Sequence, residues 1–519
     1  MVPLAPPEGV APPAGLRPAG LPAVRLSALG APVAAELFRA RDADVTGITH
    51  RTSDVRPGDL FAALPGAKAH GADYAGAAMR AGAVAVLTDA AGMTRPELRE
   101  AAESGRVAVL VHPHPRTVLG ALAATVYGDP TAALTVLGVT GTSGKTTVAH
   151  LVEAGLRAAG RSSGLLGTVG TRIGDEALPS AFTTPEAPDL QALFAVMRER
   201  GVSDVAMEVS SHALAMGRVA GTRFAVGAFT NLSQDHLDFH HDMEEYFQAK
   251  ARLFTDPELR AGHGVVCVDD EWGRRLADLA DVVTVSTTGP ADWRALDVGT
   301  EPDGSQFATV VAPDGREIPL RLQLPGAFNV ANALVALAVL DAAGVPAAVA
   351  APAFAQLAVP GRMQRVEAGQ PFLAVVDYAH KPAAVAALLD ALRAQAPRAR
   401  ILTVLGCGGD RDTGKRPIMG AAAAARSDVL IVTDDNPRTE DPAEIRAAMR
   451  AGAEAEPARG DIVEIGDRRA AIAAAVSLAK PGDVVVVAGK GHETGQDSHG
   501  VKRPFDDVHE LAAAIRAAH

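Results

Sequence analysis

The chain has 519 residues, with 61 acidic against 49 basic side chains and a formal net charge of −12. A chain of this length should form about three domains, and its negative charge, without a block of Lys or Arg, argues against nucleic acid as a partner. The two cysteines, Cys267 and Cys407, stand far apart without the spacing of a zinc site or a disulfide framework, which favours a reducing compartment.

The first 25 residues, MVPLAPPEGVAPPAGLRPAGLPAVR, are rich in Pro and Ala and have no basic region ahead of an apolar one. We expect residues 1–25 to form a flexible extension and not a signal peptide. No apolar run reaches the roughly 18 residues that a membrane span requires. The expected location is therefore the cytoplasm, without a membrane partner.

The rest of the chain alternates short apolar runs with Ala-rich stretches of helical spacing. This pattern predicts an α/β fold, in which parallel sheets are covered by helices. Turn-rich segments at 127–134 and 358–364 divide the chain into domains at 26–131, 132–358 and 359–519. Strands are expected at 84–87, 107–111, 134–140, 205–209, 265–268, 373–376, 401–405, 429–432 and 484–487, with helices between them, for example at 383–394 and 443–455.

Residues 134–156, LTVLGVTGTSGKTTVAHLVEAGL, join an apolar strand to a helix through a glycine-rich loop. Glycines let backbone N–H groups turn toward phosphate oxygens, the helix N-terminus adds partial positive charge, Lys145 adds a full charge, and a Thr hydroxyl can bind Mg²⁺. The spacing departs from the strict Walker A pattern, because Val139 stands where that pattern has Gly. The stretch predicts a nucleotide phosphate site; the alternative is an ordinary Gly-rich turn.

Two later stretches carry acids, histidines and a lysine. In DVAMEVSSHAL, Glu208 ends an expected strand, where a carboxylate can bind Mg²⁺ together with phosphate oxygens or serve a helix cap instead. In TNLSQDHLDFHHDMEEYFQAKARLF, residues 230–254, His236 lies among acids ahead of a helix that bears Lys250. Without other information, this loop could be solvated, and a Lys on a helix is usually exposed.

Three loops in the last third of the chain follow expected strands. They contain Arg411 in GCGGDRDTGKRPIMG, Asp435, Asn436 and Arg438 in TDDNPRTEDP, and Gly489 and Glu493 in VVVVAGKGHET. A single Arg in a polar loop is usually solvated. However, ligands of α/β proteins bind at the carboxyl ends of parallel strands, so the three loops can form one pocket.

The glycine-rich loop resembles the GTxGKT loop of the Mur ligases, the ATP-dependent amino-acid ligases of peptidoglycan synthesis. The resemblance covers nearly everything after about residue 45. It implies three domains: an N-terminal one for the UDP end of the substrate, a central P-loop ATPase domain with a parallel or mixed sheet, and a C-terminal Rossmann-like domain that carries the incoming amino acid. A monomer is expected.

The resemblance also implies roles for individual residues. Lys145 would be catalytic together with the metal site, where Mg²⁺ would be held by Thr146, Glu208, His236 and a carbamylated Lys250. ATP would contact Gly141, Thr142, Ser143, Gly144, Lys145, Thr146, Thr147, Asn329, Asn332, Arg362 and Asp377, so that the site spans two domains and closure assembles it. The UDP substrate would contact Thr52, Thr183, Thr184, Ser210 and Arg218, although Arg51-Thr52-Ser53 departs from the family's DSR triplet.

The DNPR pattern resembles that of the family members that take meso-diaminopimelate. This amino acid has a second carboxylate, which lysine lacks; Arg411 and Arg438 would bind it, while Asp435 and Glu493 pair with the ammonium group and Asn436 and Gly489 complete the site. The implied reaction uses ATP to phosphorylate a D-glutamyl carboxylate of UDP-N-acetylmuramoyl-L-alanyl-D-glutamate, and the amine of diaminopimelate then displaces phosphate. The alternatives are a ligase with another acceptor, such as folylpolyglutamate synthase, and a nucleotide-dependent switch.

Overall fold

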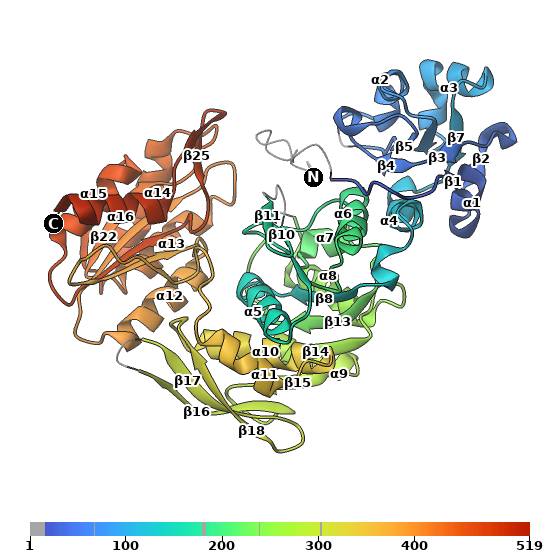
Figure 1. Ribbon diagram of the computed structural model, residues 1–519. Helices are drawn as coiled ribbons and strands as arrows, with labels where there is room; N and C mark the ends of the chain where they lie inside the picture. Colours follow the sequence, from blue (N-terminus) through green and yellow to red (C-terminus); the bar gives the residue numbers. More distant parts are fainter. Residues whose placement is uncertain (1–15, 67, 179–182, 238, 302–303, 519) are drawn as a thin grey trace.

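The computed structural model describes residues 16–66, 68–178, 183–237, 239–301 and 304–518. Figure 1 shows three α/β units arranged along an arc, with the N-terminal unit at one end and the C-terminal unit at the other. Each unit has its own main sheet, of five, eleven and six strands in chain order. No helix in the described part of the chain is long and apolar enough to cross a membrane.

The N-terminal unit has the strand order β2-β7-β6-β5-β4, in which β4 to β7 are parallel and β2 is antiparallel to β7. Two groups of buried apolar residues lie on the two faces of this sheet. Its strands are β2 (Glu36–Leu37), β4 (Gly47–Thr49), β5 (Asp59–Ala62), β6 (Ala85–Thr88) and β7 (Ala108–Val111), and its helices are α1 (Leu26–Gly30), α2 (Ala75–Arg80), α3 (Pro96–Glu103) and α4 (Pro115–Val126).

The central unit has a mixed sheet with a parallel core, of order β11-β10-β9-β12-β8-β13-β14-β15-β16-β17-β18. The strands are β8 (Thr135–Thr140), β9 (Ser163–Leu166), β10 (Thr171–Ile173), β11 (Glu176–Leu178), β12 (Asp204–Glu208), β13 (Phe224–Phe229), β14 (His263–Cys267), β15 (Val283–Ser286), β16 (Trp293–Thr300), β17 (Gln306–Val311) and β18 (Glu317–Leu322). The helices are α5 (Lys145–Ala158), α6 (Ala187–Glu199), α7 (Ser211–Ala215), α8 (Met243–Thr255), α9 (Glu271–Leu279), α10 (Phe328–Ala342) and α11 (Ala347–Phe354).

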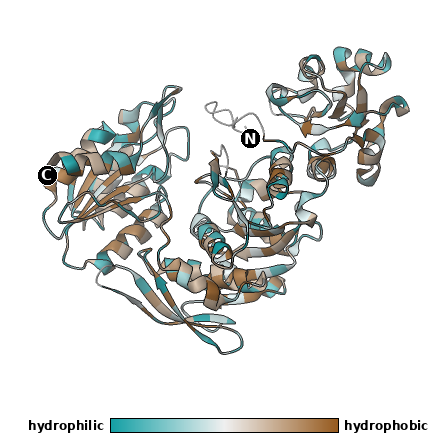
Figure 2. Cartoon of the chain, viewed as in Figure 1, coloured by the Kyte–Doolittle hydropathy of each residue, from teal (hydrophilic) through white to brown (hydrophobic). Residues whose placement is uncertain are grey.

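Successive residues of the central strands enter different cores. In β8, Val136 packs with α6, α7 and α8 on one face, while Leu137 and Val139 pack with α5 and α10 on the other. Because both faces are covered, the strands read as continuous apolar runs, which appear as brown arrows inside the units in Figure 2. This two-sided burial explains why the short apolar runs predicted these strands well.

The C-terminal unit has the strand order β19-β20-β24-β21-β22-β23, all parallel except the edge strand β19. Its strands are β19 (Gln364–Arg365), β20 (Leu373–Asp377), β21 (Ile401–Cys407), β22 (Val429–Asp434), β23 (Asp461–Glu464) and β24 (Val484–Ala488), followed by the hairpin β25 (Gly495–Ser498) and β26 (Val501–Pro504). Its helices are α12 (Pro382–Gln395), α13 (Lys415–Ala424), α14 (Pro442–Ala455), α15 (Arg468–Leu478) and α16 (Asp507–Ala518).

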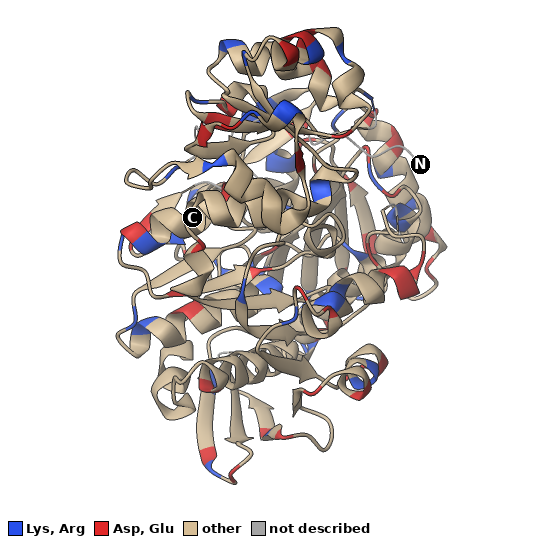
Figure 3. Ribbon diagram, turned by 90° about the vertical axis from the view of Figure 1, so that its right-hand side faces the viewer, with Lys and Arg blue, Asp and Glu red and all other residues tan. Residues whose placement is uncertain are grey.

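The predicted α/β class is correct, and each expected strand or helix lies within about two residues of an observed one. The antiparallel strands at both edges of the central sheet were not among the expected elements. On the face of the molecule drawn in Figure 3, acidic and basic residues are interspersed.

The expectation of a flexible extension needs correction for residues 16–25, while residues 1–15 lie outside the described part. Arg17 donates to both carboxylate oxygens of the buried Asp59, at 2.5 and 2.8 Å. The backbone N–H groups of Ala19 and Gly20 donate to Glu199 of the central unit. This segment therefore binds two units at once, which a Pro- and Ala-rich composition did not indicate.

Replacing Arg17 with Ala should lower the free energy of unfolding by roughly 3–5 kcal/mol, because it leaves the buried Asp59 carboxylate without its cation. Arg25→Ala is a matched control, since Arg25 is 61% exposed and its pairs with Asp42 and Asp44 are long; it should change stability by less than about 1 kcal/mol. Urea denaturation followed by circular dichroism measures both. Equal losses for the two variants would contradict the assigned role of Arg17.

Candidate active site

The loop between β8 and α5 has a backbone shape that glycine adopts most easily. Gly141 has a φ of 139° and Gly144 a φ of 88°, both in the left-handed region. A Cβ added to Gly144 would lie 2.3 Å from Asn332 Oδ1, and one added to Gly141 would lie 2.0 Å from Thr230 Oγ1. The loop therefore presents bare backbone ahead of a helix N-terminus, as phosphate binding requires.

Polar residues of neighbouring segments hold this loop in place. Asn231 Oδ1 accepts a hydrogen bond from the Ser143 N–H at 3.0 Å, and Asn231 Nδ2 donates to the Ser143 carbonyl at 3.1 Å. At the start of α10, Asn332 donates to Asn329 Oδ1 at 3.0 Å. Both α10 asparagines are buried, as are Thr142 and Thr147 of the loop. Asn332 thus lies against the loop, and neither asparagine is an exposed helix cap.

Two lysines donate to the same carbonyl oxygen of this loop. Lys145 Nζ lies 2.9 Å from Gly141 O, and Lys250 Nζ, from α8, lies 2.8 Å from it. Lys250 is only 1% exposed and lies 4.6 Å from the centre of the Tyr246 ring. Burial, reinforced by the charge of Lys145, lowers the pKa of Lys250 well below its usual value. A buried amine of this kind is readily neutral and nucleophilic, which carbamylation requires.

Glu208 gathers hydrogen-bond donors at the end of β12. Its Oε2 accepts from Thr146 Oγ1 and from Thr168 Oγ1, both at 3.1 Å, and its Oε1 accepts from the Thr168 N–H at 2.8 Å. Thr168, which sequence reasoning missed, follows β9 at the same edge of the sheet, and Thr183 contacts its hydroxyl at 2.9 Å. Thr146 and Glu208 therefore offer hard oxygen donors, which fit Mg²⁺.

A second charged group faces Lys145 from the loop after β13. His236 Nε2 lies 3.0 Å from Asp235 Oδ2, and Asp235 also forms an ion pair with Lys381 of the C-terminal unit. Burial, followed by the charge of Lys381, lowers the pKa of Lys145 to about 8, although Glu208 and Asp235 oppose this shift. Lys381, in the YAHKP stretch, was not predicted from the sequence.

The four expected metal ligands lie around the loop, with Thr146 and Glu208 in direct contact. In the part of the chain that the structure describes, no cluster of three or more His, Cys, Asp or Glu side chains could hold a metal. As an ammonium, Lys250 does not fit a cation site; as a carbamate it would supply anionic oxygen. Binding of Mg²⁺ here would therefore require hydroxyl, phosphate or carbamate oxygens besides Glu208.

The C-terminal unit reaches the phosphate loop through Arg362. Its Nη2 donates to Thr146 Oγ1 at 3.1 Å, and its guanidinium lies 4.5 Å from the centre of the Tyr378 ring. Asp377, at the end of β20, instead accepts from the N–H groups of Met363 and Ala379, at 2.6 and 2.7 Å. Burial raises the pKa of Asp377. Arg362 thus joins the two units. Asp377 holds the backbone next to Arg362 and the backbone just after β20.

Four side chains from two loops of the C-terminal unit form a buried charged cluster. The fully buried Lys490 lies 3.0 Å from Asn436 Oδ1, 3.3 Å from Glu493 Oε2 and 3.5 Å from Asp435 Oδ1. Asn436 Nδ2 also donates to Glu493 Oε2 at 2.8 Å. The sequence placed three of these residues in one pocket but overlooked Lys490, which stands between the named Gly489 and Glu493.

The two predicted arginines of this pocket differ. Arg438 adopts a φ of 53° and donates through Nη1 to the Gly409 carbonyl at 2.5 Å, which holds its guanidinium beside the loop after β21. Its charge also acts on Asp435. Arg411, in contrast, is exposed. The structure therefore brings Arg438 to the acidic cluster and does not bring Arg411 into the same contacts.

Tyr378 lies between the buried charged cluster around Lys490 and the glycine-rich loop. Its ring packs between the Arg362 guanidinium and the His492 ring, whose centre is 5.0 Å away. Burial raises the pKa of Tyr378, and the negative charges of Glu493, Asp435 and Glu208 contribute. The Gly489 N–H donates to the Asp377 carbonyl at 3.1 Å, so the two regions also share backbone contacts. Tyr378 therefore lies between residues of the charged cluster and Arg362, which contacts the glycine-rich loop.

A chain of contacts leads from Glu208 toward the N-terminal unit. Thr184 Oγ1 donates to the Glu208 carbonyl at 2.9 Å, and Arg218 Nη1 lies 3.4 Å from the Thr184 carbonyl. Arg218 and Arg116 both pair with Glu186, at 2.9 and 3.5 Å. Ser210, close to Thr184, caps α7 by accepting from the Ala213 N–H.

Arg116 lines a pocket of about 440 Å³ in the N-terminal unit. His50, Arg51, Thr52 and Tyr74 also line it. Arg51 is held by Asp54 at 2.5 Å and by Asp189 of the central unit at 3.0 Å. The expected UDP-contacting residues thus follow a continuous path from the phosphate loop to this pocket.

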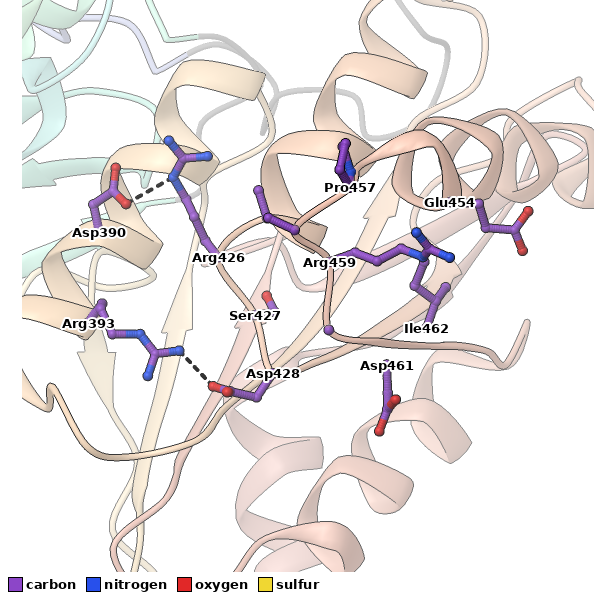
Figure 4. Close-up of a pocket in the computed structure, with 13 residues that line it drawn as sticks. Asp390, Arg393, Arg426, Ser427, Asp428, Glu454, Pro457, Arg459, Asp461 and Ile462 are labelled. Carbon is purple, nitrogen blue, oxygen red and sulfur yellow. Dashed lines mark hydrogen bonds and ion pairs between the residues drawn. The ribbon is translucent and has the colours of Figure 1, made fainter.

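A larger pocket, of about 1120 Å³, lies at the opposite edge of the C-terminal sheet, where β21, β22 and β23 begin (Figure 4). Two of its three arginines are paired with neighbouring acids: Arg393 with Asp428 at 2.6 Å, and Arg426 with Asp390 at 2.9 Å. These guanidinium groups are neutralised within the pocket. It belongs to the amino ends of the strands and is no part of the site described above.

Comparisons with known proteins agree in all three units. Residues 44–127 match the Mur ligase family catalytic domain, residues 139–340 the Mur ligase middle domain, and residues 361–491 the Mur ligase glutamate ligase domain. UDP-N-acetylmuramoyl-L-alanyl-D-glutamate–2,6-diaminopimelate ligase of Streptomyces avermitilis is 55% identical over 507 residues, covering 96% of this chain and 98% of the relative. The enzyme of the same name from Streptomyces coelicolor is 56% identical over 481 residues, covering 91% and 93%.

A solved structure of a protein with this name superimposes with a TM-score of 0.64. It is 33% identical in sequence and covers 91% of this chain and 95% of its own.

Replacing Arg362 with Met should weaken ATP binding roughly ten- to a hundredfold, because a charged hydrogen bond contributes about 1.5–3 kcal/mol. Arg398→Met removes an exposed arginine from the same unit and should leave the dissociation constant unchanged. Isothermal titration calorimetry with ATP measures the constants for both variants and the unmodified protein. Identical values for all three would show that Arg362 does not contact the nucleotide.

Proposed function

The chain belongs to the Mur ligase family, and we propose that it adds meso-diaminopimelate to UDP-N-acetylmuramoyl-L-alanyl-D-glutamate in peptidoglycan precursor synthesis. The family is ATP-dependent. One observation carries the choice of amino acid: Asp435, Asn436 and Glu493 form a charged cluster beside Arg438, and Tyr378 and Arg362 link this cluster to Thr146 of the glycine-rich loop. A ligand held by this cluster can therefore reach the phosphate loop with its other end.

Nucleotide and acceptor substrate bind on either side of the glycine-rich loop in this proposal. The bare backbone after Gly141 and the Lys145 ammonium receive the phosphates, and Arg362 closes the site from the C-terminal unit. The pocket around Thr52 receives the uridine end, and the path through Arg218 and Thr184 leads the peptide to Glu208.

The chemistry proceeds by activation of a carboxylate. A D-glutamyl carboxylate attacks the γ-phosphate of ATP, forming an acyl phosphate and releasing ADP. The free amine of diaminopimelate then attacks the acyl carbon, and phosphate leaves as the peptide bond forms. Lys145 and Arg362 stabilise the negative charge that develops in both steps. Bound Mg²⁺, held by Thr146, Glu208, His236 and carbamylated Lys250, would neutralise phosphate charge.

Arg438 provides discrimination against lysine. The second carboxylate of diaminopimelate can bind the guanidinium, whereas lysine would leave that group without an anion in a partly buried pocket. A charged hydrogen bond of about 1.5–3 kcal/mol corresponds to roughly ten- to a hundredfold discrimination. Arg411 is exposed, so its contribution would require movement of the loop after β21.

The ligase reading predicts that phosphate release from ATP requires both the UDP-muramoyl dipeptide and an amino acid. With diaminopimelate the rate should exceed that with lysine at least tenfold. A continuous phosphate assay with each substrate omitted in turn measures this dependence. Phosphate release at the same rate with and without an amino acid would favour a nucleotide-dependent switch. Release that requires a folate acceptor would favour the alternative ligase.

Arg438→Ala should raise the KM for diaminopimelate and reduce its kcat/KM roughly ten- to a hundredfold, since the second carboxylate loses its partner. The KM for ATP should stay unchanged. Arg503→Ala, in the exposed strand β26 of the adjacent hairpin, is the matched control. An unaltered preference for diaminopimelate over lysine in Arg438→Ala would refute the assignment of this residue.

Lys250→Ala should reduce kcat roughly a hundredfold or more, because the site loses an anionic group next to the transferred phosphate. Acetate or formate added at high concentration should restore part of the activity by supplying carboxylate oxygens in the space left by the side chain. Lys502→Ala, which removes an exposed lysine, serves as the control. Full activity of Lys250→Ala without added carboxylate would rule out a carbamylated ligand.

A further inference from the structure

Lys490 occupies an unusual position for a lysine. Its side chain has no exposed surface, and its three N–H groups face Asn436 Oδ1, Glu493 Oε2 and Asp435 Oδ1. An ammonium has three donors, so these acceptors use its full capacity. Burial of such a charge is costly unless neighbouring acids compensate it. Lys490 therefore belongs to the cluster itself and has no donor left for a bound amino acid.

The acids of the cluster keep one oxygen each for a ligand. Glu493 is 34% exposed, so its carboxylate reaches the opening of the pocket. Asp435 Oδ2 would lie 2.8 Å from a Cβ added to Gly489, which has a φ of 113°. Gly489 thus leaves room for this oxygen beside the loop. The remaining oxygens of Asp435 and Glu493 can both receive an ammonium group of the amino acid.

The charges in this pocket balance only when Lys490 is counted. Asp435 and Glu493 carry two negative charges, and Lys490 and Arg438 carry two positive charges. Arg468, which also lies nearby, is neutralised by Asp507 at 2.7 Å. These four groups together are therefore neutral, which matches the end of an amino acid that has one ammonium and one carboxylate. Without Lys490 it would be negative and would favour a ligand end that has only an ammonium.

We propose that Lys490 is a positioning residue that sets amino-acid specificity: by cancelling one of the two acidic charges, it makes the pocket select a zwitterionic end over a cationic one. This inference rests on the proposed function, because it concerns the same ligand. It assigns part of the discrimination against lysine to a residue that does not touch the substrate. Arg438 attracts the second carboxylate, and Lys490 prevents the acids from attracting lysine in its place.

The test compares kcat/KM for diaminopimelate and for lysine in charge variants of the full-length protein. Lys490→Met should lower the ratio of the two values at least tenfold and should leave the KM for ATP unchanged. Glu493→Gln makes the pocket positive and should raise the ratio, even though both rates fall. The double variant restores neutrality, and its ratio should return toward that of the unmodified protein. Lys480→Met, at the opposite end of β24, is the control.

A purely structural role predicts a different result. Lys490→Met would then melt at a lower temperature with an unchanged ratio, and the double variant would show no recovery; either result overturns the proposal. If Lys490→Met does not fold, the direction of the change in Glu493→Gln decides, since a lower or equal ratio contradicts the charge argument. If the unmodified protein does not use diaminopimelate, the proposed function itself is wrong. The assay of the unmodified protein shows this before any variant is compared.

Discussion

Two lysines that share the Gly141 carbonyl form the interaction on which the site depends. Lys145 and Lys250 approach this oxygen from different helices, and Arg362 and Lys381 add two cations from another unit. Even with Lys250 neutral, Lys145, Arg362 and Lys381 outnumber the carboxylates of Glu208 and Asp235. Such a concentration of positive charge in a buried region is costly for the protein alone and becomes favourable when a polyphosphate or a carbamate is present. The folded chain is therefore prepared for an anion at this point.

Sheet topology explains why distant segments meet around this charge. In the central unit, β8, β9 and β12 are parallel neighbours, so Gly141, Thr168 and Glu208 follow strands that end at the same edge. In the C-terminal unit, β24 lies between β20 and β21, which brings Asp377, Gly489 and the loop after β21 side by side. The carboxyl edges of the two sheets face each other, because Arg362 contacts Thr146 and Lys381 pairs with Asp235.

The N-terminal unit is attached to the same framework by ion pairs and by apolar packing of α4 against α6. Arg51 with Asp189 and the segment containing Arg17 and Ala19 link it to the central unit. Arg116 and Arg218 meet at Glu186 between the two units.

The sequence by itself determined the α/β class, the positions of the strands and the place of the glycine-rich loop between β8 and α5. Local rules were sufficient there, because strands buried on both faces are continuously apolar and a glycine-rich turn before a helix has few other uses. Family resemblance added Glu208, Arg362 and the cluster around Asp435. Only the tertiary structure decided that Lys490 completes this cluster, that Lys381 pairs with Asp235 and that residues 16–25 join two units. Each of these depends on contacts between segments far apart in the chain, and the charge of a lysine or arginine does not reveal from the sequence which acid it will meet or whether water will separate them.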